Sequence, residues 1–89
     1  MANRTKKNEI SERLHLTFPK HLIREPVLSI LAKKFDVVFN IRGSTVTSEM
    51  ALVELELKGE QKEVAKSIAW LKTKGVAVES LPRNVVDLD

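Results

Sequence analysis

The sequence predicts an α+β domain whose elements follow the order strand, helix, strand, strand, helix, strand. Four segments alternate apolar and polar side chains with the two-residue period of a half-buried strand, and two repeat apolar side chains at helical spacing. Proline and glycine lie between these segments, as is usual where elements end. The chain has 89 residues, 43% of them hydrophobic and 30% charged, which is enough for one such domain.

The first strand is predicted at residues 13–18, where RLHLTF alternates strictly, and Pro19 ends it. The first helix is predicted over residues 26–35. Pro26 suits its first position, because the missing N–H of proline is not needed there. The apolar residues at helical spacing are Leu28, Leu31, Ala32 and Phe35.

The second strand is predicted to start at Val37 and to reach Ile41 or further. A hairpin turn is expected within residues 43–51, at a position that the pattern does not fix. The third strand is predicted at residues 52–58, where apolar residues alternate with glutamates, and Gly59 is expected to end it.

The second helix is predicted over residues 60–74, with Gly75 as its C-terminal cap. A fourth strand follows at residues 76–80, and Pro82 ends it. The expected apolar stripe of this helix consists of Val64, Ile68 and Leu71, with Ala65 and Ala69 allowing close approach.

These elements form the ferredoxin-like βαββαβ plan. Each helix connects two strands of one sheet, and the right-handed crossover rule puts both helices on the same face. The sheet is then four-stranded and antiparallel, in the order 4-1-3-2, with the second strand at an edge and the other face open. By alternation, this open face carries Arg13, His15, Thr17, Val38, Asn40, Arg42, Leu52, Glu54, Glu56, Ala77 and Glu79.

The folded domain is expected at residues 12–82, between a disordered polar leader at 1–11 and a tail at 83–89. The chain has no cysteine, which excludes a disulfide framework, and its start has no apolar core of a secretory signal. No apolar run approaches the roughly 18 residues that a membrane span needs. We therefore expect a cytoplasmic protein that does not insert into membranes.

The net charge of +3 is unevenly distributed along the sequence. Residues 1–13 carry four basic and two acidic side chains, whereas residues 14–89 carry eleven basic and ten acidic ones. The nearly neutral body, together with a sheet face without aromatic residues, predicts that the domain does not bind nucleic acid specifically.

No catalytic set, metal site or cofactor motif is recognisable, so we expect no enzyme. His15 and His21 lie on a strand and a connection and are interpreted as surface residues. Glu54 and Glu56 share a strand face and are expected to pair with Arg13 or Arg42. Acylphosphatase-like enzymes share this topology, but their glycine-rich loop after the first strand is missing here, and FPKHLIREP takes its place.

Asn40 allows two interpretations, because asparagine is a poor strand former. It can be a hydrophilic residue on an open sheet face, which needs no further explanation. Alternatively, its amide, which both donates and accepts hydrogen bonds, contacts a ligand beside the unpaired backbone of an edge strand. Another copy of the chain or an amino acid would pair with such an edge.

The segments LTFP, EPVLSILAKKFDVVFNI, LVELELKGE and SIAWLKTKGVAVE resemble the NIL domain of methionine-importer ATPase subunits, over about residues 12–82. The resemblance implies an ACT-like regulatory domain that forms a homodimer and binds methionine or a related amino acid near the dimer interface. It carries Asn40 over as the ligand-contacting residue, with Phe39 and Ile41 as neighbours.

The resemblance also implies partner proteins, and at one position this sequence departs from the family's pattern. A standalone copy would act on a transporter subunit or a protein of sulfur amino-acid metabolism. Where the family often has glycine at the start of the third strand, this chain has Met50-Ala51-Leu52. The alternative function is therefore a protein-interaction module that has lost the ligand.

Overall fold

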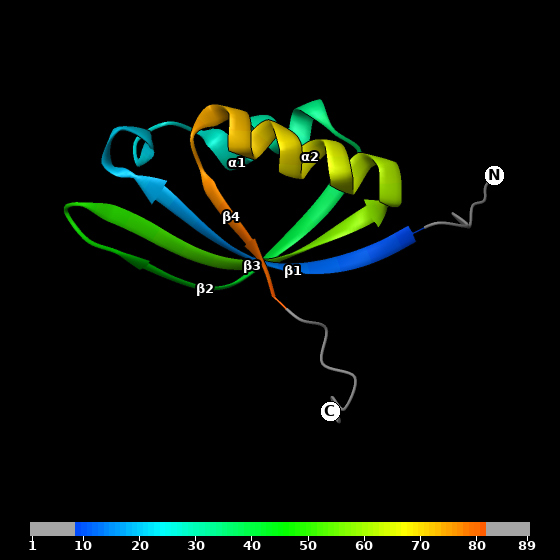
Figure 1. Ribbon diagram of the computed structural model, residues 1–89, viewed down its shortest axis with the longest axis horizontal. Coiled ribbons are helices and arrows are strands. Elements are labelled where there is room, and N and C mark those ends of the chain that lie inside the picture. Colours follow the sequence, from blue (N-terminus) through cyan, green and yellow to red (C-terminus); the bar gives the residue numbers. More distant parts are fainter. Residues whose placement is uncertain (1–8, 82–89) are drawn as a thin grey trace, which may run out of the picture.

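The computed structural model describes residues 9–81 of the chain. A four-stranded antiparallel sheet is covered on one face by two α-helices (Figure 1). The strand order β2-β3-β1-β4 confirms the predicted order and the ferredoxin-like plan. The elements are β1 (Glu9–Pro19), the 3₁₀ turn η1 (Lys20–Leu22), α1 (Val27–Lys34), β2 (Val37–Val46), β3 (Met50–Glu60), α2 (Gln61–Lys74) and β4 (Ala77–Ser80).

The central strands β1 and β3 are longer than the alternation predicted. β1 begins at Glu9, within the segment 1–11 that was expected to be a leader, because its pairing with β3 continues to Glu9 opposite Glu60. Ile10 packs against the core from this extension. Pro19 is the last residue of β1, as predicted. Residues 1–8 and 82–89, with the predicted end of the last strand at Pro82, lie outside the described residues.

The hydrophobic core lies between the sheet and the helices. Every second residue of β1 and β3 points into it, as predicted from the alternation, and α1 and α2 close it from the other side. Phe35 and Trp70 join the two helices at the margin of the core, with ring centroids 6.1 Å apart in an edge-to-face arrangement. The residues exposed by less than 2% are Leu14, Leu16, Val27, Leu31, Leu55, Leu57, Val64, Ser67 and Leu71.

The helices present partly different faces to the sheet from those predicted. α1 begins at Val27, one residue after Pro26, and Ala32 is exposed. Ala65 and Ala69 of α2 are also exposed. The buried face of α2 instead contains Ser67, whose hydroxyl donates a hydrogen bond to Glu63 O at 2.8 Å. A small polar side chain can be buried here because its donor is satisfied within the helix.

Gly59 does not end β3, contrary to the prediction from sequence. It is buried inside the strand opposite Val37, where β2 begins. A Cβ atom at this position would lie 3.0 Å from Asp36 O and 3.1 Å from Val37 Cγ1. The glycine therefore permits a close approach of the chain rather than a turn.

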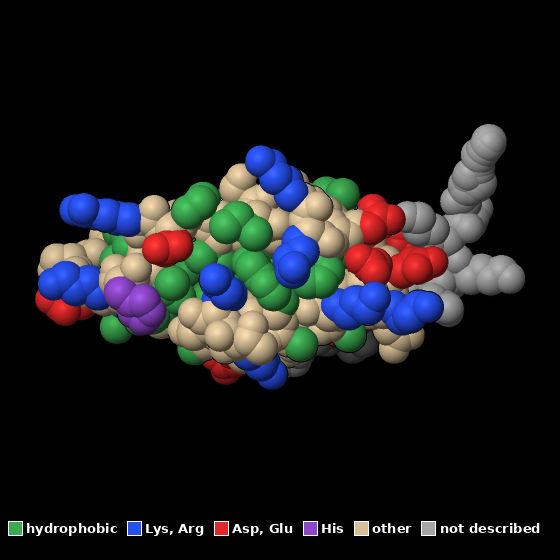
Figure 2. All heavy atoms as spheres, turned by 90° about the horizontal axis from the view of Figure 1, so that it is seen from above, with side chains coloured by type: hydrophobic (Ala, Val, Ile, Leu, Met, Phe, Trp, Pro, Cys, Tyr) green, Lys and Arg blue, Asp and Glu red, His purple; other side chains and the backbone are tan. Residues whose placement is uncertain are grey.

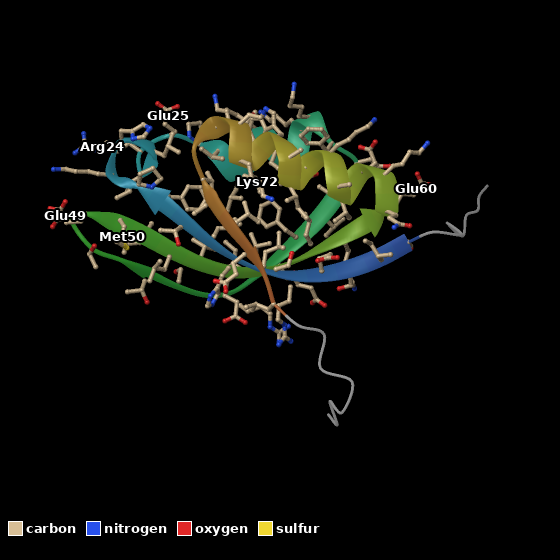
Figure 3. The ribbon with its side chains drawn as sticks, viewed as in Figure 1. Arg24, Glu25, Glu49, Met50, Glu60 and Lys72 are labelled. Atoms are coloured by element: carbon tan, nitrogen blue, oxygen red, sulfur yellow. The ribbon has the colours of Figure 1, made fainter. Side chains whose placement is uncertain are left out.

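The hairpin turn, whose position the sequence left open, lies at residues 47–49. Thr47 N–H donates to Met50 O at 2.9 Å, and Thr47 Oγ1 accepts hydrogen bonds from the backbone N–H groups of Glu49 and Met50, each at 3.1 Å. Figure 3 shows Glu49 and Met50 at the tip of this hairpin, at the same end of the molecule as Arg24 and Glu25.

Candidate ligand site on the edge strand

Asn40 is exposed and lies on β2, an outermost strand of the sheet. It stands opposite Glu56 of β3, on the open face. Phe39 and Ile41 point to the other face: Phe39 packs partly against the core, and Ile41 is 53% exposed. The structure therefore places the three predicted site residues side by side on one edge, but divides them between the two faces of the sheet.

The outer edge of β2, called the β2 edge below, has no strand paired with it within residues 9–81. In an edge strand, alternate backbone N–H and C=O groups point away from the sheet and can pair with another chain or with a polar ligand. A register irregularity between Ile41 and Gly43 interrupts the regular ladder just beyond Asn40. The candidate residues thus lie on the stretch of regular pairing that precedes this irregularity.

The carboxylate of Glu56 gives the neighbourhood of Asn40 its charge. Ser11 Oγ donates a hydrogen bond to Glu56 Oε2 at 2.7 Å, and Arg42 Nη1 lies 3.7 Å from Glu56 Oε1. The hydrogen bond from Ser11, aided by the positive charges of Lys58, Arg42 and Arg13, holds the pKa of Glu56 below its ordinary value. Arg42 is one of the two partners predicted from the sequence, whereas Ser11 was not predicted because it lies in the segment expected to be a leader.

A shallow hollow of about 370 Å³ lies farther along the open face. His15 forms part of it, with its Nε2 3.6 Å from Glu54 Oε1 and with Glu79 opposite it on β4. Gly43 of β2 also lines the hollow, and no atom lies within 4 Å of the position that a Cβ atom would take there. Asn40 does not line this hollow. His15 remains 51% exposed, in agreement with the interpretation of a surface histidine.

The exposed large apolar side chains are concentrated on the β2–β3 hairpin. Within the described part of the chain, five of the six belong to this hairpin and one, Ile30, to α1. The hairpin residues are Val38, Ile41, Val46, Met50 and Leu52. These residues are divided between the two faces of the hairpin: Val38 and Leu52 lie on the open face, and Ile41 and Val46 on the helix face.

The described residues contain neither a candidate metal site nor a membrane-spanning helix. No group of three or more histidine, aspartate or glutamate side chains within residues 9–81 is placed to hold a metal ion. In the same range, no helix has the length and apolar character needed to cross a bilayer.

The fold and the site define a class of protein: a small ferredoxin-like domain with an open sheet face, a free edge strand and an exposed amide on that edge. The comparison with known families then identifies the chain itself. The family model of the NIL domain matches residues 12–80, and the chain belongs to the NIL domain family.

Similar proteins are found among importer subunits. The chain is 34% identical over 61 residues to methionine import ATP-binding protein MetN 1 of Listeria innocua, and 33% identical over 61 residues to its counterpart in Listeria monocytogenes. Each alignment covers 64% of this chain and 18% of the relative, so the chain spans only a small part of the relatives' length.

A solved structure supports the fold. The C-terminal domain of an ABC transporter ATP-binding protein from Enterococcus faecalis superimposes with a TM-score of 0.71, covering 82% of this chain and 86% of that one. A designed protein, Foldit4, superimposes with a TM-score of 0.54. Their sequence identities are 17% and 6%, so both similarities concern the fold alone.

Proposed function

We propose that this chain is a non-catalytic regulatory domain that binds methionine or a related amino acid at a homodimer interface. One observation carries the proposal: the exposed amide of Asn40 lies on the free edge strand of a NIL domain. The named relatives are methionine import ATP-binding proteins, which supports methionine as the first ligand to test.

The surroundings of Asn40 suit the two charged groups of an amino acid. The amide of Asn40 can donate to a carboxylate and accept from an ammonium group. Arg42 and Glu56 supply one charge of each sign beside it. Phe39 and Ile41 lie on the opposite face of the same edge and offer apolar contacts there. A ligand or a second copy bound along the edge would touch both faces.

Binding would act by stabilising one arrangement of two subunits, which in turn changes their interaction with a partner. The partner we propose is a transporter subunit or a protein of sulfur amino-acid metabolism, in the cytoplasm. A ligand changes such an equilibrium only by its difference in affinity between the two arrangements. An interface site meets this requirement, because separated subunits hold only half of it.

Calorimetric titration of methionine into the wild type and Asn40→Ala tests the proposal. Hydrogen bonds to charged groups contribute roughly 1.5–3 kcal/mol, so the variant should bind about 10- to 100-fold more weakly. Because Asn40 is exposed, the free energy of unfolding of Asn40→Ala should differ from that of the wild type by less than about 1 kcal/mol in thermal melts. Thr45→Ala is the matched control, an exposed residue on the same strand beyond the register irregularity, and should bind normally.

Equal affinity of wild type and Asn40→Ala would show that Asn40 is a surface residue only. If the wild type produced no heat with any amino acid at millimolar concentration, the sensing function itself would be wrong. The exposed apolar residues of the β2–β3 hairpin would then favour the alternative, a protein-interaction module without a ligand.

A further inference from the structure

An aromatic pair with a lysine over each ring lies on the helix side of the domain. Phe35, directly after α1, and Trp70 of α2 meet edge to face, with ring centroids 6.1 Å apart. Lys34 Nζ lies 5.9 Å from the centroid of the Phe35 ring, and Lys74 Nζ lies 5.8 Å from that of Trp70. Cation–π attraction therefore holds one ammonium group over each ring. These four residues are called the aromatic–lysine cluster below.

The polar groups of the aromatic–lysine cluster have no protein partner within residues 9–81. Neither Lys34 nor Lys74 forms an ion pair with a carboxylate of these residues, and the indole N–H of Trp70 donates to none of their acceptors. Both lysine side chains are exposed, and Trp70 is partly exposed. An ammonium group and an indole N–H are donors only, so the cluster offers hydrogen bonds to an acceptor outside the domain.

The surroundings of the cluster are basic. All eight lysine and arginine side chains of residues 20–36 and 61–75, which form and join the helices, are exposed. In the part of the chain that the structure describes, only Lys66 among them is ion-paired, with its Nζ 3.6 Å from Glu63 Oε2. Figure 2 shows basic side chains across this side, with hydrophobic side chains between them. An anionic group is therefore attracted by the whole layer and meets fixed donors at the cluster.

We propose that the aromatic–lysine cluster is the centre of a docking surface for an acidic segment of a partner protein. Carboxylates of the segment bind the two ammonium groups and the indole N–H, and its apolar atoms rest against the rings. Tryptophan is among the residues that most often carry the binding energy at the centre of an interface. Asn40 lies on the open face of the sheet, so a ligand at the β2 edge and a partner on the helices occupy separate surfaces.

The charges of the helix layer favour a narrow acidic segment over an anionic membrane. Asp36 and Glu63 lie together in this layer, where the N–H group of Asp36 donates to Glu63 Oε1 at 2.9 Å. A planar layer of anionic headgroups would meet these carboxylates as well, whereas a peptide segment can pass beside them. Among the described residues, Ile30 is the only exposed large apolar side chain of the two helices, which leaves little to enter a bilayer.

Trp70 is the single tryptophan of the chain, so its indole N–H signal in NMR spectra reports on the cluster directly. The probe is a peptide of 14 residues, the length of α2, in which glutamate alternates with alanine. Titration of this peptide into the isotope-labelled protein should shift the Trp70 signal saturably. A peptide with lysine in place of glutamate should not shift it. Raising the salt from about 50 to about 300 mM should weaken binding, because salt screens exposed charges.

Two double variants separate the cluster from the general charge of the layer. Lys34→Gln with Lys74→Gln removes both ammonium groups of the cluster and should weaken binding of the glutamate peptide about tenfold, as expected for the loss of two exposed ion pairs. Lys20→Gln with Lys62→Gln is the matched control, which removes the same charge from exposed positions of the same layer outside the cluster. It should weaken binding by less than about twofold. Circular dichroism melts verify that both variants are folded.

A saturable shift of the Trp70 signal, with the large loss of affinity in Lys34→Gln/Lys74→Gln alone, supports the proposal. Equal losses in the two double variants would show general attraction without a defined site and would overturn it, as would an unchanged Trp70 signal at millimolar peptide. Binding to phosphatidylglycerol vesicles without binding to the peptide would assign the layer to membranes and overturn the protein partner. The methionine titration is read separately, because the amino-acid site proposed at the β2 edge uses none of these side chains.

Discussion

Glu56 illustrates how much a single residue depends on partners that are distant in sequence. Alternation places it on the open face of β3, and the neighbouring strands then bring Ser11 from β1 and Arg42 from β2 to its carboxylate. A hydrogen bond and a positive charge both stabilise the ionised form, which lowers its pKa. Glu56 beside Asn40 therefore stays ionised to a lower pH than an ordinary glutamate does.

Ser11→Ala should raise the pKa of Glu56 towards its ordinary value, as measured by NMR titration of the side-chain carboxyl carbon. The largest cause of the lowered pKa is then removed, while Arg42, Lys58 and Arg13 remain. Ser44→Ala, which removes an exposed hydroxyl from β2, is the control and should leave this pKa unchanged.

The sign of the accompanying stability change follows from the lowered pKa. A carboxyl with a folded-state pKa below its unfolded value stabilises the protein above the unfolded pKa, and this contribution is lost as the pH falls through the folded value. The stability difference between wild type and Ser11→Ala should therefore be larger at neutral pH than in acid. A difference that grows on acidification would contradict this account.

At the scale of elements, glycines have different roles at the end of a helix and inside a strand. Gly75 ends α2 with φ of 100°, a left-handed conformation, and its N–H group bonds to Lys72 O at 3.1 Å. Gly43 lies next to the irregularity in β2, where an added methyl group would meet no atom within 4 Å and φ is not left-handed. The two glycines therefore serve different purposes: Gly75 is the C-terminal cap of α2, as predicted from the sequence, whereas Gly43 lies inside β2.

Gly75→Ala should lower the free energy of unfolding by about 1–2 kcal/mol, because residues with a Cβ atom are strained in the left-handed region. Gly43→Ala is the matched control and should change stability by less than about 0.5 kcal/mol, since its new methyl meets open space. Chemical denaturation of the two variants measures both values. Equal losses would show that the cap of α2 contributes no special stability.

At the scale of the whole molecule, opposite charges are separated between the two layers. Residues 20–36 and 61–75, which form and join the helices, carry eight basic and three acidic side chains, whereas the remaining described residues of the sheet layer carry three basic and seven acidic ones. Figure 2 shows lysine and arginine side chains spread across the helix side. The folded domain is therefore nearly neutral in net charge although its helix layer is basic and its sheet layer is acidic.

Charge separation gives the domain a definite polarity. The helix layer is the basic one and the sheet layer the acidic one. A partner would then be selected by the sign of its own surface charge, and the attraction would weaken with salt.

We expect a homodimer in solution, because a domain of this size buries only about 60% of its unfolded surface and leaves an edge and a sheet face uncovered. Its melting temperature should rise with protein concentration, as it does when association stabilises the folded state. Light scattering and melts over a concentration series measure both properties. A monomer at about 100 μM with a constant melting temperature would contradict the expectation, since standard interfaces commonly bind more tightly.

The sequence by itself determined the elements that have a clear period and the topology that joins them. The alternation around Leu14 and Leu55 and the helical spacing of Val64 and Leu71 were sufficient, because burying one face of each element requires these periods. The ferredoxin-like plan that these elements form then placed β2 at the edge, and Asn40 with it.

Only the tertiary structure decided the features that depend on distances between segments. From the sequence, Gly59 is expected to end a strand, but the structure packs Asp36 and Val37 closely against it inside β3. Ser67 is polar, yet it is buried, because its hydroxyl donates a hydrogen bond to the backbone of α2. The carboxylate of Glu56 and the hydroxyl of Ser11 are 45 positions apart in the chain. No local period encodes such contacts, because they arise from the register between strands, which the folded sheet sets as a whole.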